Sequence, residues 1–420
     1  MAAETVDSAW RQRAQRVLPG GMYGHLSTKL LPESYPQFFS RAAGVNIWDV
    51  NGNAYIDYMC AFGPNLLGYG DAEVDEAYIE QLKLGDTMTG PTPLLVELAE
   101  AMVAQVSHAE WALFCKNGTD ATTAAVMSAR AGTGRSTILR ARGAYHGTSP
   151  WCTPMTAGTT DGDRSNQIFY DFNDPASLRV AADSAGTDLA AIVASPINQH
   201  AFLTQQMPTV EYALEARRIC TERSALLITD EVRTGFRCSR DGTWDDLGAP
   251  PDLSAWGKVI ANGHCISVLL GNAKARAGAE AIFVTGSFWY SAASMAAALV
   301  VMRRIRDTAY LEYLEKIGSM LRTGLGELAS RHGIDFEQSG PVTMPLWKFK
   351  DDPDLRAGFF WCSEMLRGGI YTHPWHNMFI NAAMTETHVE ATLKSADSAF
   401  RELNAARSHL PANLRLSAFL

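Results

Sequence analysis

Asp230 and Lys258 are the two residues whose types and positions most directly suggest chemistry. Asp230 ends the apolar run 226–229, and a carboxylate at a buried strand end needs a cationic partner. A pyridinium nitrogen is one such partner, because a carboxylate beside it keeps the ring protonated and makes it an electron sink. An aspartate that only caps the following turn explains this segment equally well.

Lys258 follows Asp230 by twenty-eight positions and ends a second strand-like run, 252–257. A lysine at a buried strand end is desolvated, so its pKa falls and its amine becomes a better nucleophile. Most single lysines are solvated surface charges. The pairing with Asp230 is therefore what favours a catalytic amine at this position.

Two segments have the composition of a phosphate cradle. Within 116–121 a strand-like run ends and a helix begins, so Asn117, Gly118 and Thr119 offer free helix amides, a flexible backbone and a hydroxyl. An ordinary helix capped by Asn117 or Thr119 fits the same residues. The segment 285–291 adds further hydroxyls and a glycine before another helical pattern.

Tyr145 supplies an aromatic ring shortly after the apolar run 137–140. Such a ring can stack on a pyridine ring, although packing within a loop is the commoner role of a tyrosine. His146 and Gly147 follow it directly. This turn is a second candidate contact for a flat cofactor.

The hydrophobic pattern predicts the elements that position these residues. Short apolar runs bounded by Gly, Asp or Asn predict strands buried on both faces, and they occur at 112–115, 137–140, 189–194, 225–229 and 266–270. Helical patterns at 121–131 and 210–223 lie between them. Strands that alternate with helices predict an α/β fold with a mainly parallel, doubly wound sheet. Such sheets bind ligands at the carboxyl ends of their strands, where the residues above are expected.

Both ends of the chain have a different pattern. Residues 45–58 form two strand-like halves around Asn51-Gly52, a strong hairpin signal. Beyond residue 300, helical and strand-like patterns are mixed, at 309–331, 342–349, 357–367 and 386–403. We therefore expect a large domain at 61–300 and a smaller α+β domain made of 1–60, with its β-hairpin, and 301–420.

Composition argues against several classes of partner. Of the 420 residues 47% are hydrophobic and 19% are charged, as in compact globular proteins. The net charge of -9, without runs of like charge, argues against nucleic acid and anionic membranes, and no stretch reaches the ~18 apolar residues of a membrane helix. The seven cysteines form no CxxC pair and the first residues lack a signal-peptide pattern, so we expect a cytoplasmic protein without a metal site.

These segments, in this order, resemble the class III pyridoxal phosphate (PLP) aminotransferases of fold type I, and most closely the branch that contains glutamate-1-semialdehyde aminomutase. The family's Ser-Gly-Thr-Glu-Ala phosphate loop is matched by 117–121, and its Tyr/Phe-His-Gly turn by 145–147. Its Asp-Glu-Val-x-Thr-Gly-Phe-Arg motif is present at 230–237 and its Gly-Lys cofactor site at 257–258. The likeness covers nearly the whole chain.

The resemblance implies a role for each matching residue. Lys258 would bind PLP as a Schiff base and Asp230 would pair with the pyridine nitrogen, which makes these two the catalytic residues. A homodimer is implied as well, because in this family the segment around Ser287 reaches the phosphate of the neighbouring subunit's cofactor. The implied cofactor-binding set is Lys258, Asp230, Val232, Tyr145, His146, Gly118, Thr119, Asn117, Thr285 and Ser287.

The implied reaction is transamination between two small molecules by a ping-pong mechanism. An amino compound leaves its amino group on the cofactor, and a carbonyl acceptor then takes it away. Two alternatives use the same cofactor chemistry: an intramolecular aminomutase of the semialdehyde type and an amino-acid racemase. A catalytically silent PLP-binding protein is the third alternative, and its motive is Ser195 before Pro196, where the family has Glu-Pro.

Further departures from the family bear on the substrate. The aminomutase branch has an arginine shortly after Pro-Gly-Gly, but 19–27 contains none, and the branch's C-terminal glutamate falls at His376. The usual semialdehyde is therefore not the expected substrate. Aromatic residues more often belong to a core, but here they suggest a cleft for an amine or a partly apolar amino compound, lined by Tyr23, His25, Phe62, Trp151, Trp289 and Trp375.

Overall fold

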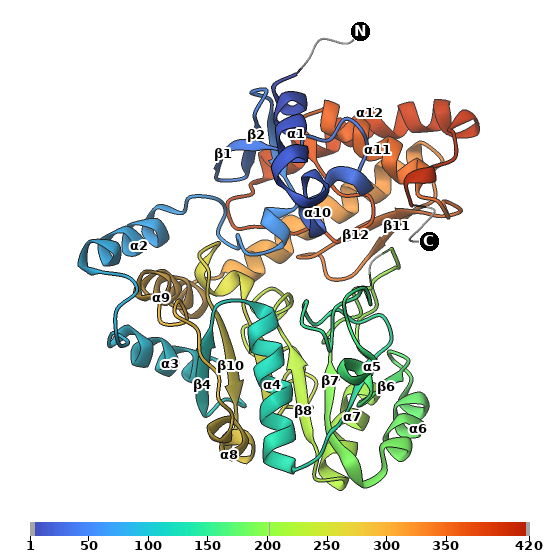
Figure 1. The fold of residues 1–420 in the computed structure, drawn as a ribbon. Coiled ribbons are helices and arrows are strands. Elements are labelled where there is room, and N and C mark those ends of the chain that lie inside the picture. Colours follow the sequence, from blue (N-terminus) through green and yellow to red (C-terminus); the bar gives the residue numbers. More distant parts are fainter. Residues whose placement is uncertain (1–4, 201, 417–420) are drawn as a thin grey trace.

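A seven-stranded sheet forms the centre of the larger part of the molecule, in the lower half of Figure 1. Its strands are β4 (Trp111–Cys115), β5 (Thr137–Ala141), β6 (Gln167–Tyr170), β7 (Leu189–Ala194), β8 (Leu226–Asp230), β9 (Leu253–Trp256) and β10 (Ser267–Gly271). The structure, a computed structural model, describes residues 5–200 and 202–416. The spatial order is β4-β10-β9-β8-β7-β5-β6, and within the described chain β10 alone runs antiparallel to its neighbours in this sheet.

Helices cover both faces of this sheet. On one face α4 (Gly118–Thr133) packs with α8 (Ala273–Ala281), and on the other α6 (Pro175–Ala185) packs with α7 (Val210–Glu222). The buried side chains of the inner strands alternate between these two layers. Both faces of the sheet are therefore apolar, which is why its strands occur in the sequence as continuous apolar runs.

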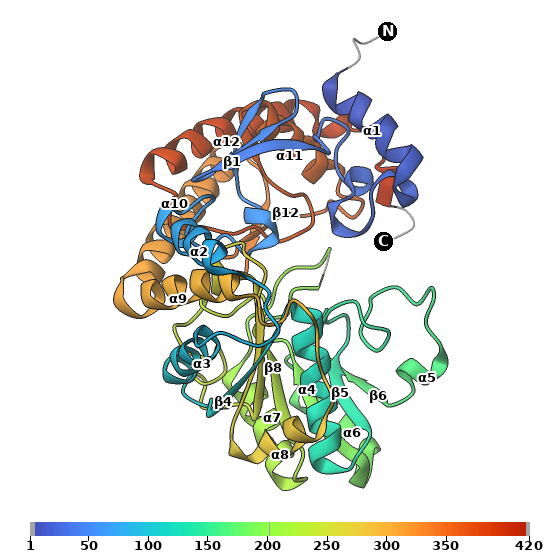
Figure 2. The same ribbon diagram turned by 60° about the vertical axis from the view of Figure 1, so that its left-hand side comes forward.

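The smaller part of the molecule is built from both ends of the chain, as Figure 2 shows. Its elements are α1 (Val6–Val17), β1 (Phe39–Ala43), β2 (Asn46–Asp49), β3 (Ala54–Asp57), α10 (Tyr310–Arg331), β11 (Phe336–Ser339), β12 (Leu346–Phe349), α11 (Arg356–Arg367), β13 (Ile370–Tyr371) and α12 (Glu386–Ala406). One sheet has the order β1-β2-β3-β13, and β11 pairs with β12 in another. Because β13 pairs with β3, the C-terminal part of the chain completes a sheet begun near the N-terminus.

Three further helices pack together beside the large sheet. These are α2 (Ala72–Leu84), α3 (Leu94–Gln105) and α9 (Ala292–Asp307). α9 packs against both α2 and α3, and α3 contacts β4. The remaining short helix, α5 (Asp161–Arg164), precedes β6.

The predicted α/β fold with a mainly parallel sheet is confirmed. The five predicted strands correspond to β4, β5, β7, β8 and β10 with ends shifted by a residue, and the predicted hairpin is β2 and β3. Gly52 has a φ of 90° in the hairpin turn, a conformation that glycine adopts without strain. The predicted domain boundaries stay a prediction.

The predicted strand 342–349 is wrong in its first half. The N–H of Met344 donates to the carbonyl of Pro341 over 3.0 Å, which makes a turn, and Pro345 has no N–H to give to a neighbouring strand. The strand therefore begins only at Leu346. The short strands β1, β6, β11 and β13 are absent from the prediction.

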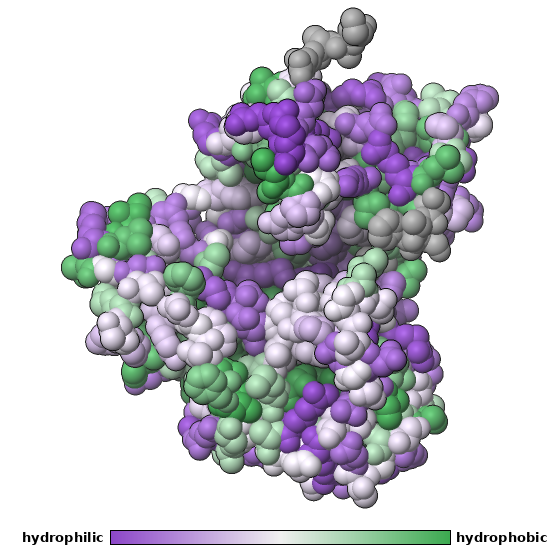
Figure 3. All heavy atoms as spheres, viewed as in Figure 1, coloured by the Kyte–Doolittle hydropathy of each residue, from purple (hydrophilic) through white to green (hydrophobic). Residues whose placement is uncertain are grey.

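No helix within the described ranges is long and apolar enough to cross a membrane. Residues 1–4, the beginning of the segment considered for a signal peptide, lie outside the described residues. Figure 3 shows that the surface is hollowed between the two parts of the molecule, and hydrophilic residues lie at the bottom of the hollow.

Candidate active site

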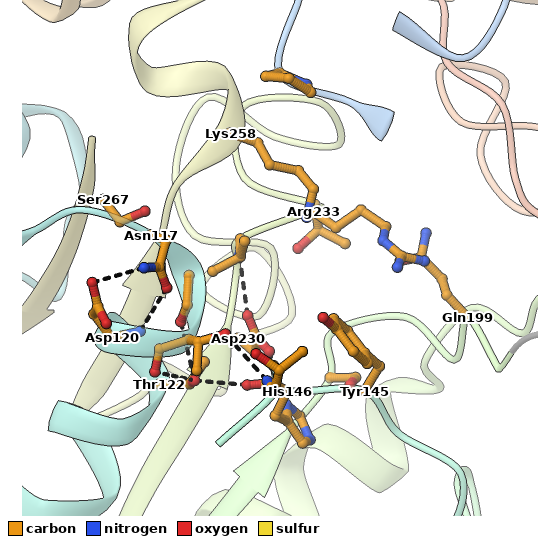
Figure 4. A pocket seen from close by; sticks show the side chains of 18 of the residues that line it. Asn117, Asp120, Thr122, Tyr145, His146, Gln199, Asp230, Arg233, Lys258 and Ser267 are labelled. Atoms are coloured by element: carbon orange, nitrogen blue, oxygen red, sulfur yellow. Dashed lines mark hydrogen bonds and ion pairs between the residues drawn. The ribbon is translucent and has the colours of Figure 1, made fainter. Parts of the chain in front are cut away.

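A cavity of about 670 Å³ lies at the carboxyl ends of the parallel strands. Figure 4 shows side chains that line it. Eight of the predicted site residues belong to the lining: Asn117, Gly118, Thr119, Tyr145, His146, Asp230, Val232 and Lys258. The fold thus gathers at one edge of the sheet residues that come from the ends of several strands.

Lys258 follows β9 after a single residue and begins a short 3-10 turn, Lys258–Ala261. Its φ of 48° is left-handed, which is uncommon for a residue with a side chain and is typical of functional sites. Burial and, to a smaller extent, the positive charge of Arg233 together lower the pKa of Lys258 to about 7, against an opposing effect of Asp230. Near neutral pH a large share of this amine is therefore unprotonated and nucleophilic.

Asp230, at the end of β8, is held in a fixed orientation from two sides. His146 Nδ1 lies 2.8 Å from Asp230 Oδ2, and the N–H of Val232 donates to Asp230 Oδ1 over 3.2 Å. The His146 ring is buried and stacks on Trp151, with ring centroids 6.3 Å apart. Asp230 still lines the cavity, so this fixed carboxylate can accept a hydrogen bond from a group placed there.

The start of α4 has the free amides of a helix N-terminus. Asn117 is its N-cap, because its side-chain oxygen accepts from the N–H of Asp120 over 3.0 Å. The N–H of Thr148 donates to Thr119 Oγ1 over 3.2 Å, which ties the helix start to the turn after Tyr145. A Cβ at Gly118 would lie 2.7 Å from Val232 Cγ1, so only a residue without a side chain lets the backbone come this close to Val232 in the cavity wall.

Tyr145 and Val232 contribute apolar surface to the cavity wall. Tyr145 is 47% exposed, and burial raises the pKa of its hydroxyl. Val232 packs with Cys115, Ala121 and Ala255. The side chain of Tyr145 is thus free to contact a ligand, whereas the side chain of Val232 is held against residues of the sheet and α4.

Thr285 and Ser287 lie outside the cavity lining and are exposed. They belong to the loop between α8 and α9, beside the exposed side chains Phe283 and Phe288. The fold therefore does not bring these two hydroxyls to the cavity of their own chain.

Of the six residues expected in an aromatic cleft, His25 lines the cavity. Phe62 lies edge-on to His25 at 4.6 Å and to His376 at 5.4 Å. Burial is the largest cause that lowers the pKa values of both histidines, so both are neutral near pH 7. Trp151 instead packs beneath His146, and Tyr23, Trp289 and Trp375 lie outside the lining.

The lining also includes residues that the sequence analysis does not predict, among them Arg233, Gln199 and Ser267. Arg233 stands at the variable position of the motif 230–237, so its charge was a signal that could have been read. Ser267 lies at the start of β10, close to Gly257. A Cβ at position 257 would lie 2.6 Å from Ser267 Oγ, so a residue other than glycine there would collide with this hydroxyl. Gln199 had no distinguishing sequence feature.

A reactive amine and a fixed carboxylate beside a helix N-terminus, on a doubly wound sheet, are the features of a PLP-dependent enzyme of fold type I. The comparisons with known proteins agree, since residues 31–383 match the family model described as aminotransferase class-III. The chain belongs to this family, and it is a PLP-dependent aminotransferase.

Named relatives cover almost the whole chain. An aminopentol aminotransferase from Sphingopyxis macrogoltabida is 54% identical over 400 residues, 95% of each chain. A glutamate-1-semialdehyde 2,1-aminomutase from Methanothermobacter thermautotrophicus is 32% identical and covers 92% of this chain and 96% of its own. The solved structure of the PLP internal aldimine form of the FumI protein of Sphingopyxis sp. MTA144 has a TM-score of 0.96 and 52% identity, covering 97% of this chain and 98% of its own.

The aminomutase branch is thus present among the relatives, at lower identity than the aminotransferase. The aminomutase, racemase and silent alternatives are not favoured. The cavity fits PLP by its own chemistry, because free helix amides can receive a phosphate, a carboxylate can pair with a ring nitrogen, and a lysine amine can bind an aldehyde.

Proposed function

We propose that Lys258 binds PLP as a Schiff base and that Asp230 pairs with the pyridine nitrogen. The observation that carries this proposal is the presence of both groups in one cavity, with the pKa of Lys258 lowered to about 7 and the Asp230 carboxylate held by His146. In this arrangement His146 is a positioning residue. It orients Asp230 through the contact between His146 Nδ1 and Asp230 Oδ2.

The same proposal assigns the phosphate to the N-terminus of α4, with Asn117, Gly118 and Thr119. The helix dipole and the unpaired amides of the first turn favour a dianion at this point. Tyr145 and Val232 would contact the two faces of the cofactor ring, and the exposure of Tyr145 into the cavity supports its part.

When bound, PLP supplies an electron sink for the carbon that bears the substrate nitrogen. Asp230 stabilises the protonated pyridine nitrogen on which this depends. Lys258, with its amine free, would be placed to take the proton from that carbon and to deliver it to the cofactor carbon on the other side of the nitrogen. The amine of Lys258 is suited to both directions because a pKa near 7 makes it a base and an acid of comparable strength at neutral pH.

We propose a hydroxylated primary amine as the amino donor. The relative at 54% identity is named for aminopentol, an amine whose name denotes several hydroxyl groups. In this chain His25, which lines the cavity, and the nearby His376 are neutral, so they suit hydroxyl groups better than a carboxylate. Phe62 between them adds apolar surface for the carbon chain.

We also propose a cytoplasmic homodimer in which Thr285 or Ser287 contacts the phosphate of the partner's cofactor. Large apolar side chains near this segment and on α2 support a partner surface, since Phe283 is 87% exposed, Phe288 63% and Leu84 78%. The absence of disulfides among the described cysteines supports a reducing compartment.

The direct test follows the two half-reactions by absorbance. Purified wild-type protein should show a visible lysine–cofactor band that a hydroxylated primary amine bleaches and a carbonyl acceptor restores. Lys258→Ala should lack this band, and the loss would be specific if the surface variant Lys83→Ala kept it. A Lys258→Ala protein with an unchanged band would overturn the assignment of the lysine.

A further inference from the structure

Arg140 is a buried arginine whose guanidinium lacks hydrogen-bond partners. It lies on β5, next to the edge strand β6 of the large sheet, and it is 6% exposed. Two of its nitrogens, Nε and Nη1, are buried and meet no acceptor within the described chain. No other side chain in the described ranges has two such atoms. Because buried polar groups in folded proteins almost always have partners, this arginine points to a ligand.

Arg237 shows how the protein satisfies another buried arginine. Its Nη1 donates to the carbonyl of Ile380 over 2.7 Å, and its Nη2 donates to the carbonyl of Gly63 over 2.8 Å. Arg140 has instead the ring of Phe169, with its guanidinium carbon 4.9 Å from the ring centroid. A ring face attracts the cation as a whole but does not replace hydrogen bonds to its N–H groups. The donors at Nε and Nη1 of Arg140 therefore remain available.

A second arginine lies close to Arg140 and adds to the positive charge. Arg164 is the last residue of α5, which lies beside β6 in Figures 1 and 2. Its Nη2 donates to the carbonyl of Thr153, whereas its Nε is buried and has no partner among the described residues. Burial is the largest cause that lowers the pKa of Arg140, and the charge of Arg164 acts in the same direction. The two guanidinium groups are therefore near each other.

No carboxylate balances these two charges. Within residues 5–200 and 202–416, neither Arg140 nor Arg164 forms an ion pair, and no Asp or Glu acts on the pKa of Arg140. Asp163 precedes Arg164, but its carboxylate accepts from the N–H and the hydroxyl of Thr160. The thiol of Cys152 is near Arg140, but burial raises its pKa to about 11, so it is neutral near pH 7. Two cations are thus left without a counter-charge.

The surroundings of Arg140 are apolar or neutral. It shares its face of β5 with Ile138, which belongs to the same apolar cluster as Trp151 and Cys152. On β6, Gln167 donates from Nε2 to the carbonyl of Trp151 over 2.7 Å, and its Oε1 is buried without a partner in the part of the chain that the structure describes. This oxygen can accept one N–H, but a neutral amide cannot balance two charges. The enclosed position leaves room only for a small ligand.

We propose that Arg140 and Arg164 bind a small monovalent anion such as chloride, held by Nε and Nη1 of the first and Nε of the second. Such an ion accepts N–H groups from several directions and removes the cost of a buried unpaired charge. It joins β5 to the segment 142–166, which includes α5. Trp151 in this segment stacks on His146, so the anion supports from behind the residue that orients Asp230. Neither arginine lines the active-site cavity, so this is a separate site.

The test is a thermal melt of the purified holoenzyme at constant ionic strength, in sodium chloride and in sodium gluconate, whose anion is too large for an enclosed site. Chloride at about 100-fold above its Kd should raise the Tm of the wild type by roughly 3 °C. The rise should saturate with chloride concentration, as binding to one site requires. Transamination is not part of the readout, so the result is independent of the proposed function.

Arg140→Met gives the sharpest outcome, because it removes the charge and keeps an unbranched side chain. In gluconate this variant should be at least as stable as the wild type, since it removes an unpaired buried charge, and chloride should no longer raise its Tm. An arginine with a purely structural role predicts the opposite, a lower Tm in both salts. Arg164→Gln changes a half-buried residue and serves if Arg140→Met does not fold. It should weaken chloride binding by about 10-fold or more.

Arg142→Gln is the matched control, because Arg142 is an exposed arginine that pairs with Asp171. It should keep the wild-type response to chloride. The linewidth of the chloride NMR signal provides a second measurement, and wild-type protein should broaden it more than Arg164→Gln does. A wild-type Tm that is the same in both salts would mean that neutral groups such as Gln167 satisfy the donors, and it would overturn the proposal. A chloride response that persists in Arg140→Met and Arg164→Gln would overturn it too, because the ion would then bind elsewhere.

Discussion

Two His–Asp pairs in this molecule share a geometry and differ in their surroundings. His146 Nδ1 lies 2.8 Å from Asp230, and His108 Nδ1 lies 3.0 Å from Asp245. All four side chains are largely buried. The difference lies in the group that each pair meets on its other side.

The His108 pair is closed. His108 Nε2 lies 2.8 Å from Ser254 Oγ, which in turn accepts a hydrogen bond from Trp256 Nε1 over 2.7 Å. The order Asp-His-Ser is that of an acyl-transfer triad. However, Ser254 is fully buried in β9 and lines none of the described cavities, so no substrate can reach its hydroxyl.

The His146 pair is open on the side of its carboxylate. Asp230 lines the cavity that contains Lys258, whereas His146 Nε2 is buried without a hydrogen-bond partner in the described chain. A His–Asp pair is therefore structural when its carboxylate is enclosed by the protein, as in the His108 pair. It is available for chemistry when its carboxylate faces a cavity, as in the His146 pair. The geometry of a pair does not by itself identify a catalytic site.

The strongest test of this comparison is Asp230→Asn. If Asp230 pairs with the cofactor ring as proposed, loss of its charge corresponds to the ~3–5 kcal/mol of a broken buried ion pair, which lowers the rate of the amine half-reaction by roughly 10²- to 10⁴-fold. Single-turnover absorbance measures this rate, and a thermal melt shows whether the fold is kept. A rate within a few-fold of wild type would contradict the role of Asp230.

Asp245→Asn is the matched change in the closed pair. It should destabilise the protein by about 2–4 kcal/mol, because the carboxylate accepts from Ser107 and pairs with a buried histidine. The half-reaction rate of the folded protein should stay at the wild-type value. Urea unfolding and single-turnover kinetics on the same sample provide the two numbers, and a rate loss as large as that of Asp230→Asn would remove the distinction between the pairs.

Ser254→Ala probes the far end of the closed network. It leaves His108 Nε2 and Trp256 Nε1 without their partner, at a cost of about 1–3 kcal/mol in unfolding free energy. Transamination should be unaffected, and a serine-directed fluorophosphonate should not label native wild-type protein. Labelling at Ser254 would show that the triad is accessible after all.

The smallest effect concerns the pH dependence of cofactor capture. In cofactor-free protein the unprotonated amine of Lys258 reacts with PLP, so the rate should rise with pH and reach half its maximum near pH 7, whereas free acetyl-lysine needs a far more alkaline pH. Asp230 favours the protonated lysine and thus raises its pKa, so Asp230→Asn should move the half-maximum to lower pH. Asp245→Asn should not move it, and a shift in that variant would mean that the closed pair acts on the cavity.

Much of the fold could be predicted from the sequence, because its strands are local features. The run that forms β7 is apolar at every position, and the run that forms β8 is apolar up to Ile228, as in buried parallel strands. Asp230 and Lys258 were found because each directly follows such a run. The turn that ends the predicted strand at 342–349 was missed, because Pro341 and Pro345 act there through backbone hydrogen bonds rather than through hydrophobic pattern.

The environment of the candidate site could be predicted only in part. Tyr145, His146 and the residues at the start of α4 follow strands in the same way as Asp230 does. Trp151 was expected near a substrate and instead packs beneath His146, since an aromatic residue in a loop has no pattern that sets its direction. The cofactor roles of Thr285 and Ser287 stay a prediction, because they depend on a second chain.

By itself the sequence determined the sheet, the positions of the carboxylate and the amine, and their order along the chain, since each depends on a few neighbouring residues. The tertiary structure alone decided that His146 orients Asp230, that His108 and Asp245 form a closed network, and that Asn377 accepts a hydrogen bond from Arg233. These contacts join residues 84, 137 and 144 positions apart. No local pattern encodes such separations, because only the packing of whole elements brings the partners within hydrogen-bonding distance.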